Sequence, residues 1–145
     1  MNQAKRILVQ MWLKKAQIDL LVAQKLANDF PDVAIYHCQQ SAEKALKGFL
    51  ILHDRDPGKT HNIDSLLREV GSIRPELPRE LKEATKLTQY NQLYRYPEEA
   101  TEDFNPTPGE VSKAFYTAKA VYEKICEAMP HEILPKPQQK PDIPR

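Results

Sequence analysis

Apolar side chains recur every three or four residues through most of this 145-residue chain, and that spacing restricts it to a helical fold. Residues at such intervals share one face of a helix, which can then pack on a neighbouring helix. The chain has only four glycines, and no convincing stretch alternates between apolar and polar residues as a half-buried strand requires. We therefore predict an all-α protein, folded as an antiparallel up-and-down bundle of four to five helices.

The periodicity places five helical segments, at about residues 4–27, 32–53, 63–71, 77–94 and 107–129. Gly71 is expected to end the third segment, because glycine commonly follows the last turn of a helix. Thr107 and Glu110 have the spacing of a capping box at the start of the fifth segment, with proline at its first position. The first segment is predicted to bury one apolar face, which consists of Leu8, Trp12, Ala16, Leu20, Ala23 and Ala27.

Proline becomes frequent after Met129, and large apolar residues become scarce. A segment of this composition buries too little surface to offset the conformational entropy that it loses on ordering. We therefore predict a helical domain over residues 1–129 and an extended or disordered Pro-rich tail over residues 130–145.

Charge and cysteine content narrow the classes of function. The formal net charge is +1, which argues against a strongly basic nucleic-acid binder but allows a local basic patch. Cys38 and Cys126 are far apart and match no metal-binding spacing, so we expect reduced thiols in a cytoplasmic protein without metal or cofactor. No apolar run approaches the roughly 20 residues of a membrane-spanning helix, and we expect no membrane association.

The turn after the second segment contains Gly58, Lys59 and Thr60, which resemble the end of a phosphate-binding loop. The complete loop needs a glycine where this chain has His53, and it follows a strand rather than a helix. We therefore reject a nucleoside triphosphatase. The turn is explained as a connection between two helices, in which Gly58 allows the bend. Either Thr60 or Asn62 can cap the third helix.

Several stretches share one recognisable pattern. The second segment and the following turn have the form Q-x-A-E-K-A-x-K, then a short loop, then T-H-x-x-x-x-L, and the matching residues are Gln40, Ala42, Glu43, Lys44, Ala45, Lys47, Thr60, His61 and Leu66. WLKKAQIDLLVAQKL in the first segment and YRYPEEA before the last segment agree with it. Together, over about residues 11–129, these stretches resemble the HEPN domain family. The resemblance is to small stand-alone prokaryotic members, which are often found beside a minimal nucleotidyltransferase.

The resemblance implies a helical bundle that usually forms a homodimer, and either RNA cleavage or the binding of a nucleotide or a partner. Ribonuclease members carry an R-x(4–6)-H motif near the start of a late helix. There, arginine and histidine of two protomers stabilise charge and transfer protons without a metal. In this chain Arg95 has no histidine at that interval. Arg55 and His61 have the spacing but flank the Pro-Gly turn, so the sequence points away from an enzyme without deciding the question.

Cationic side chains form the candidate binding site. We predict that they converge on one end of the bundle and hold a phosphate of a nucleotide or of RNA. If the first two helices are antiparallel, Asp19 can pair with Lys44 or Lys47. The alternative is a solvated polar face whose ion pairs each contribute about 0–1 kcal/mol. The predicted phosphate-binding residues are Lys44, Lys47, Lys59, His61 and Arg95.

Two tyrosines near the last predicted helix, Tyr94 and Tyr96, are candidates for a dimer interface or for stacking on a base. Charge is also uneven, because the charged residues among the first fifteen are all basic and residues 98–103 carry four acids. Opposed patches of this kind suit self-association or a protein partner.

Three functions remain open from the sequence. The favoured one is a homodimeric binding module that engages a nucleotide or phosphate, or a nucleotidyltransferase partner as in a toxin–antitoxin pair. The first alternative is a metal-independent ribonuclease with a composite site across the dimer, for which Arg55 and His61 are the remaining candidates. The second alternative is a protein–protein scaffold with no nucleotide role.

Overall fold

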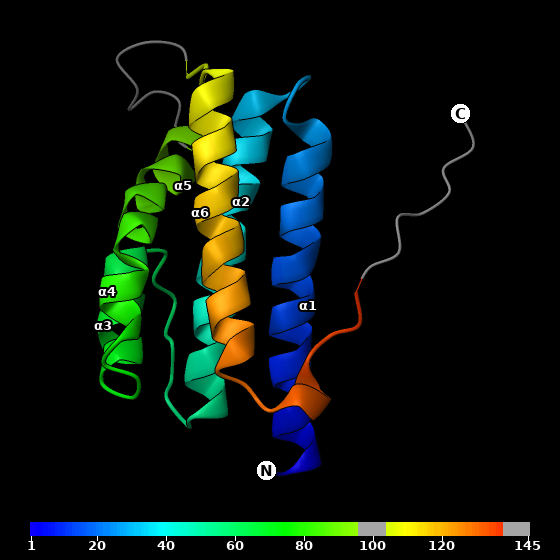
Figure 1. Cartoon of the computed structure of the whole chain (residues 1–145), viewed down its shortest axis with the longest axis vertical. Helices are drawn as coiled ribbons and strands as arrows, with labels where there is room; N and C mark the ends of the chain where they lie inside the picture. Colours follow the sequence, from blue (N-terminus) through cyan, green and yellow to red (C-terminus); the bar gives the residue numbers. More distant parts are fainter. Residues whose placement is uncertain (96–103, 138–145) are drawn as a thin grey trace, which may run out of the picture.

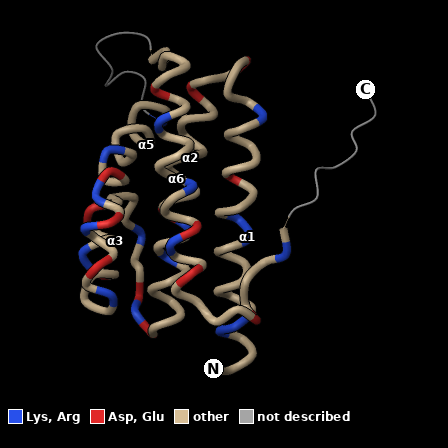
Figure 2. The backbone as a smooth tube through the Cα atoms, viewed as in Figure 1, with Lys and Arg blue, Asp and Glu red and all other residues tan. Residues whose placement is uncertain are grey.

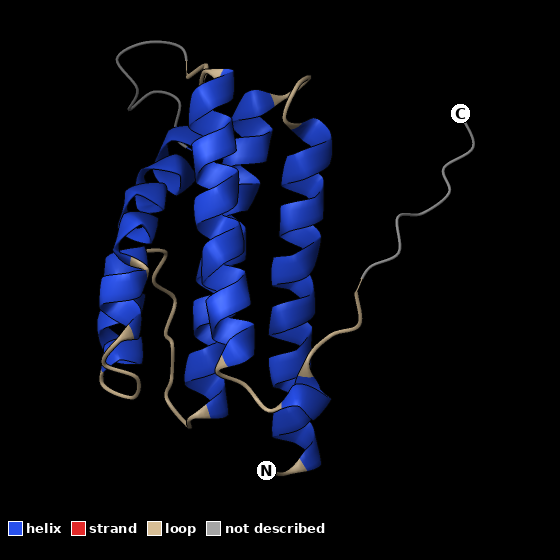
Figure 3. Ribbon diagram, in the orientation of Figure 1, coloured by secondary structure: helices blue, strands red, loops and turns tan. Residues whose placement is uncertain are grey.

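The computed structural model describes residues 1–95 and 104–137, and within these ranges every regular element is a helix (Figure 3). The all-α prediction is therefore confirmed. In the same ranges, no helix combines the length and the apolar character needed to cross a membrane. In chain order the elements are α1 (Gln3–Leu26), α2 (Pro31–Leu52), α3 (Ile63–Gly71), α4 (Leu77–Glu80), the 3₁₀ helix η1 (Lys82–Leu87), α5 (Thr88–Arg95), α6 (Pro108–Glu127) and the 3₁₀ helix η3 (His131–Ile133).

The long helices lie side by side, and the chain reverses direction between them (Figure 1). In that view α1 rises, α2 descends beside it, the stretch from α4 to α5 rises again, and α6 descends. The helix α2 is the central element, because it contacts α1, α3, α5, α6 and η1. The predicted bundle is thus the observed one, and any site built on α2 is flanked by other elements on several sides.

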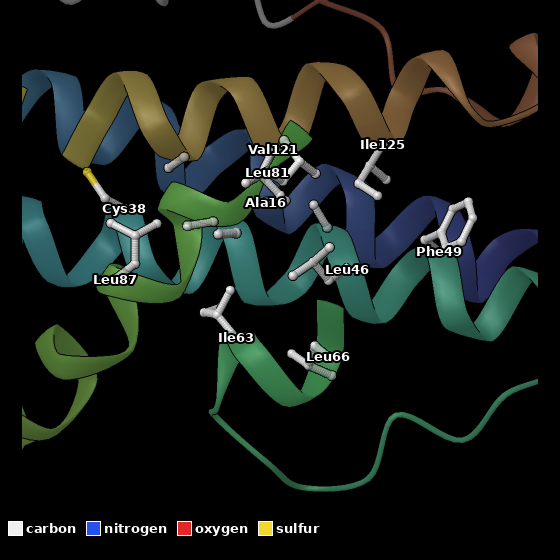
Figure 4. Close-up of a cluster of buried hydrophobic side chains, with 14 of the residues drawn as sticks. Ala16, Cys38, Leu46, Phe49, Ile63, Leu66, Leu81, Leu87, Val121 and Ile125 are labelled. Atoms are coloured by element: carbon white, nitrogen blue, oxygen red, sulfur yellow. The ribbon is translucent and has the colours of Figure 1, made fainter. Parts of the chain in front are cut away.

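The core lies along α2, where side chains from the surrounding helices meet it (Figure 4). Leu46 and Phe49 of α2 are fully buried, as are Ile63 at the start of α3 and Ile125 of α6. Removing a large aliphatic or aromatic side chain from water stabilises a fold by about 2 kcal/mol. The long-range contacts that join α2 to its neighbours therefore rest mainly on these apolar side chains.

The buried face of α1 agrees with the predicted one at Ala16, Leu20 and Ala23, and it differs near the start of the helix. Leu8, which we expected in the core, is 44% exposed, whereas Val9 and Leu13 are fully buried. The helix is apolar on two sides, so the spacing of apolar residues alone cannot indicate which side meets α2. The buried residues of α1 are Val9, Leu13, Ala16, Asp19, Leu20 and Ala23.

The predicted fourth helix is divided into α4, η1 and α5. At η1 the Ala84 N–H donates to the Leu81 carbonyl at 3.0 Å, the three-residue backbone spacing of a 3₁₀ turn. The division matters for the site, because α5 and η1 contact α2 and belong to separate helical pieces.

The cap and the end of α3 lie where the sequence predicts them, but the reason for glycine at its end is different. Asn62 Oδ1 accepts a hydrogen bond from Ser65 N at 3.1 Å and so caps α3. Gly58 has a φ of 67°, as a bend made by glycine requires. Gly71 ends α3 as predicted, but its φ is not positive. Instead, a Cβ at this position would lie 2.6 Å from Pro78 Cγ, so glycine is needed for close packing.

The Pro-rich segment is packed in the part that the structure describes. Ile133 in η3 is fully buried, and Leu134 packs against the core. Gln17 Nε2 donates to the Lys136 carbonyl at 3.2 Å and ties the segment to α1. The packed residues therefore continue past Met129, where the sequence analysis ends the domain. Residues 138–145, the rest of the predicted tail, lie outside the described residues.

Candidate functional site

The buried polar side chains of the described residues concentrate on α2 and on the segments next to it. Taking such groups out of water costs several kcal/mol unless they find hydrogen-bonding partners. Most of them belong to, or contact, two clusters on α2, while the Ser41 hydroxyl donates to the Ala16 carbonyl at 2.8 Å. The buried polar residues are Asp19, Gln39, Gln40, Ser41, Glu43, Lys47 and Asn91.

Glu43 is the centre of the first cluster. Its Oε1 lies 2.9 Å from His61 Nδ1 and accepts from Gln39 Nε2 at 3.0 Å. Its Oε2 lies 3.1 Å from Lys47 Nζ, and the Glu43 and Lys47 side chains are 5% and 6% exposed. The His61 side chain is 42% exposed. We call Gln39, Glu43, Lys47 and His61 the Glu43 cluster. In it, a buried Glu43–Lys47 ion pair contacts the Nδ1 side of a partly exposed histidine ring.

Asp19 is the centre of the second cluster, which joins α1 to α2. Its Oδ2 accepts from Lys44 Nζ at 2.6 Å, and its Oδ1 lies 2.8 Å from His37 Nδ1. The predicted pairing of Asp19 is therefore confirmed with Lys44, while Lys47 pairs with Glu43. We call Asp19, His37 and Lys44 the Asp19 cluster. Like Glu43, Asp19 holds a histidine with one oxygen and a lysine with the other.

An amide chain and a tyrosine pair continue the polar side of α2 toward α5. Gln40 Nε2 donates to Gln39 Oε1 at 2.7 Å and to Asn91 Oδ1 at 3.3 Å. The rings of Tyr36 and Tyr94 stack with their centroids 4.3 Å apart. Tyr94, predicted for an interface or for base stacking, is therefore already stacked within the chain, although it stays 39% exposed. Tyr96 lies outside the described residues.

The five predicted phosphate-binding residues lie on three segments. Lys44 and Lys47 are on α2, Lys59 and His61 are on the loop before α3, and Arg95 is at the end of α5. The contacts of Asn91 with Gln40 and of Tyr94 with Tyr36 mean that α5 runs antiparallel to α2. Arg95, which ends α5, therefore lies toward the first turns of α2. His61 lies beside Glu43. Glu43 is seven residues beyond Tyr36 on α2, which is about 10 Å along the helix at a rise of 1.5 Å per residue.

The charges of these residues also differ. Lys44 and Lys47 are neutralised by the buried carboxylates of Asp19 and Glu43. Lys59 is exposed on the loop before α3 and makes no hydrogen bond or ion pair with the residues that the structure describes. Lys59 and His61 thus lie on the same loop before α3. Lys44 and Lys47 differ from them because each is already paired with a carboxylate inside the protein.

The two remaining catalytic candidates contact different helices. Arg55 Nη1 lies 3.7 Å from Glu69 Oε2 on α3, whereas His61 contacts Glu43 on α2. Among the described residues, each of them is thus paired with a carboxylate of its own.

The cysteines are structural rather than reactive. Burial, followed by the charge of Asp19, raises the pKa of the Cys38 thiol to about 12. Burial also raises the pKa of Cys126. A protonated thiol is a poor nucleophile and metal ligand. Among the described residues, no group of three or more His, Cys, Asp or Glu side chains is arranged to hold a metal ion.

Sequence reasoning missed His37, Tyr36 and Asn91. His37 could have been found, because it shares a helical side with Gln40 and Lys44 at spacings of three and four residues. Asn91 gives no local signal, because its role depends on α5 returning beside α2.

Comparison with known proteins gives one result. The family model of the HEPN domain matches residues 9–129, which include most of α1, all of α2 through α6 and both polar clusters. No curated protein and no solved structure matches the chain significantly.

Proposed function

Because the chain belongs to the HEPN domain family, we propose that it is a homodimeric helical binding module that engages the phosphate of a nucleotide or RNA. Membership of this family points to a nucleotide- or RNA-related role. In this proposal the module works without chemistry of its own, and a nucleotidyltransferase acts as its protein partner, as in a toxin–antitoxin pair.

The supporting observation is the Glu43 cluster, which holds His61 at the surface on the same short loop as Lys59. A buried ion pair is a weak source of stability, and apolar residues of similar size often serve a core as well. Its presence under a half-exposed histidine is therefore better explained by a need to orient that ring. His61, when protonated, and Lys59 both offer N–H groups, the donors that a phosphate accepts.

The same contacts redefine the predicted site. Lys44 and Lys47 already have buried carboxylate partners, with which a phosphate would have to compete. We therefore assign the direct contacts to Lys59 and His61. Arg95, at the other end of the polar side of α2, would contact only a ligand that extends along the helix, such as a single-stranded RNA.

The ribonuclease alternative has less support. Arg55 and His61 contact different helices, so a composite site would need an arginine from a second protomer next to His61. No contact among the described residues favours that arrangement over binding alone.

The proposal is tested by an amide NMR titration of the purified chain with ATP and then with a short single-stranded RNA. We expect saturable shifts in residues 58–62, extending toward Arg95 with RNA only. Lys59→Ala should raise the Kd about tenfold, which corresponds to about 1.4 kcal/mol for one charged hydrogen bond. Lys86→Ala, which removes an exposed lysine of η1, is the matched control and should leave the Kd unchanged.

Two results would contradict the binding proposal. If neither ligand shifts residues 58–62, the protein–protein scaffold becomes the better reading. If the RNA is cleaved in the titration, and cleavage is lost in His61→Ala, the chain is a ribonuclease. Sedimentation equilibrium of the unliganded chain tests the homodimer separately, with a monomer at micromolar concentration as the opposing result.

A further inference from the structure

The outward side of α1 carries large apolar side chains that the core does not use. Eight large hydrophobic residues are exposed in the described part of the chain, and five of them fall within the first 18 residues. Ile7 is 47% exposed, Met11 is 51% exposed and Ile18 is 40% exposed. These three residues lie within about 40° of one another around the helix axis, at 100° per residue. They therefore form one stripe, about 16 Å long at 1.5 Å per residue.

A groove runs beside this stripe. Its volume is about 580 Å³, and it lies between α1 and residues 132–137 of the C-terminal segment. Ile7 and Met11 line one wall, and Leu134 lines the other. The hydrogen bond from Gln17 to the Lys136 carbonyl holds the second wall in place. Exposed apolar residues grouped beside a groove are typical of a docking face rather than of scattered surface residues.

The charge around the stripe is basic. Lys14 and Lys15 are exposed on α1 on either side of the stripe, and Lys136 borders the groove. Among residues 1–95 and 104–137, Glu132 is the one acidic residue that lines the groove. Asp19 is the one acidic residue of α1, and it is buried against α2 (Figure 2). Two copies of α1 placed face to face would bring lysine against lysine, so charge disfavours a second copy of this chain as the occupant.

We propose that this face of α1 docks an amphipathic helix of a protein partner, with apolar residues at spacings of three and four and flanking Asp or Glu. The apolar residues of the partner fill the groove beside Ile7 and Met11 and cover Ile18 further along α1, and its carboxylates meet Lys14 and Lys15. This is the helix-in-groove mode of recognition, in which apolar anchors give affinity and charge gives orientation. The face is separate from the Glu43 cluster, so a partner and a phosphate ligand can be bound together.

The test uses a synthetic helical peptide of 18 residues, with leucine at spacings of three and four and glutamate beside the leucines. Its twin has lysine in place of every glutamate. We expect the acidic peptide to bind the full chain saturably in a fluorescence anisotropy titration, more weakly at high salt, and the basic twin not to bind. Ile18→Lys should weaken binding at least tenfold. Phe30→Lys, at another exposed apolar residue that lies outside the stripe, is the control.

A second variant does not depend on the apolar stripe. Lys14→Glu with Lys15→Glu changes only exposed side chains, so its circular dichroism should match that of the unmodified chain, while binding of the acidic peptide is lost. The proposal is overturned if neither peptide binds, or if both bind equally. It is also overturned if sedimentation shows that Ile18→Lys converts a dimer of the free chain to a monomer, because the face would then be a self-interface.

Discussion

Lys47 lies on a polar side of α2 in the sequence, but its side chain is buried in the structure. Its side chain is 6% exposed, its Nζ lies 3.1 Å from Glu43 Oε2, and the same atom is 5.9 Å from the centre of the Trp12 ring. The contact with the ring is within the range of a cation–π interaction. Lys47 is therefore a buried structural partner of Glu43, and its charge is matched inside the protein.

Breaking this pair should be costly. Lys47→Met leaves the Glu43 carboxylate buried without its ammonium partner, and we expect a loss of about 3 kcal/mol in the free energy of unfolding. Urea denaturation measures the change. Lys86→Met removes an exposed ion pair with Glu83 and should change stability by no more than about 0.5 kcal/mol. Equal effects of the two substitutions would mean that the Glu43–Lys47 pair is solvated in solution.

Cys38 gives a prediction about pH. The folded state holds its thiol pKa at about 12, above the ordinary value of 9.0. Between pH 9 and 12 the unfolded chain therefore binds fewer protons than the folded chain, and stability falls as the pH rises. We expect a smaller loss between pH 8 and pH 10 in Cys38→Ala than in the unmodified chain, as measured by urea denaturation. Burial also raises the pKa of Cys126 and of Tyr122, but these two residues are present in both proteins. Identical dependence of stability on pH in the two proteins would therefore refute the role of Cys38.

At the scale of the element, α6 begins through contacts between neighbouring residues. Thr107 Oγ1 accepts from Glu110 N at 3.1 Å, and Glu110 Oε1 accepts from Thr107 N at 3.2 Å. Both halves of the capping box are therefore present, as the sequence predicts.

This cap can be weighed directly. Thr107→Ala removes the acceptor for the Glu110 N–H, and we expect a destabilisation of about 1 kcal/mol. Thermal unfolding followed by circular dichroism would detect it. Ser112→Ala alters an exposed residue of the same helix away from its cap and serves as the control. A Thr107→Ala protein as stable as the control would mean that packing on α2 alone fixes the start of α6.

The helix α1 shows where local patterns stop being sufficient. Its inward side carries Val9 and Leu13, and its outward side carries Ile7, Met11 and Ile18. Both sides satisfy the periodicity of a helix, so the sequence predicts the helix but not its rotation about its own axis. That rotation is decided by the fit of α1 against α2 and α6.

At the scale of the whole molecule, the chain packs beyond its last long helix. Ile133 is fully buried, and η3 contacts α1 near the start of the chain. Residues far apart in the sequence therefore stabilise each other, although the composition after Met129 is that of an extended tail.

The contribution of this segment can be measured. We expect Ile133→Ala to destabilise the protein by about 3 kcal/mol, because it leaves a cavity in the core. His131→Ala, two residues earlier and exposed, should have little effect in the same urea denaturation. If both substitutions are neutral, the segment after Met129 does not pack on α1 in solution.

The sequence by itself determined where the long helices α1, α2 and α6 lie and how α6 begins, and it narrowed the cap of α3 to Thr60 or Asn62, because capping and apolar spacing act over a few residues. It also predicted that Asp19 pairs with a lysine of α2, since both lie on facing helices. Only the tertiary structure decided which lysine Asp19 takes, which side of α1 is buried, and that Glu43 holds His61. Those outcomes depend on which distant segments share a given patch of α2, and that is settled by the packing of all the helices together.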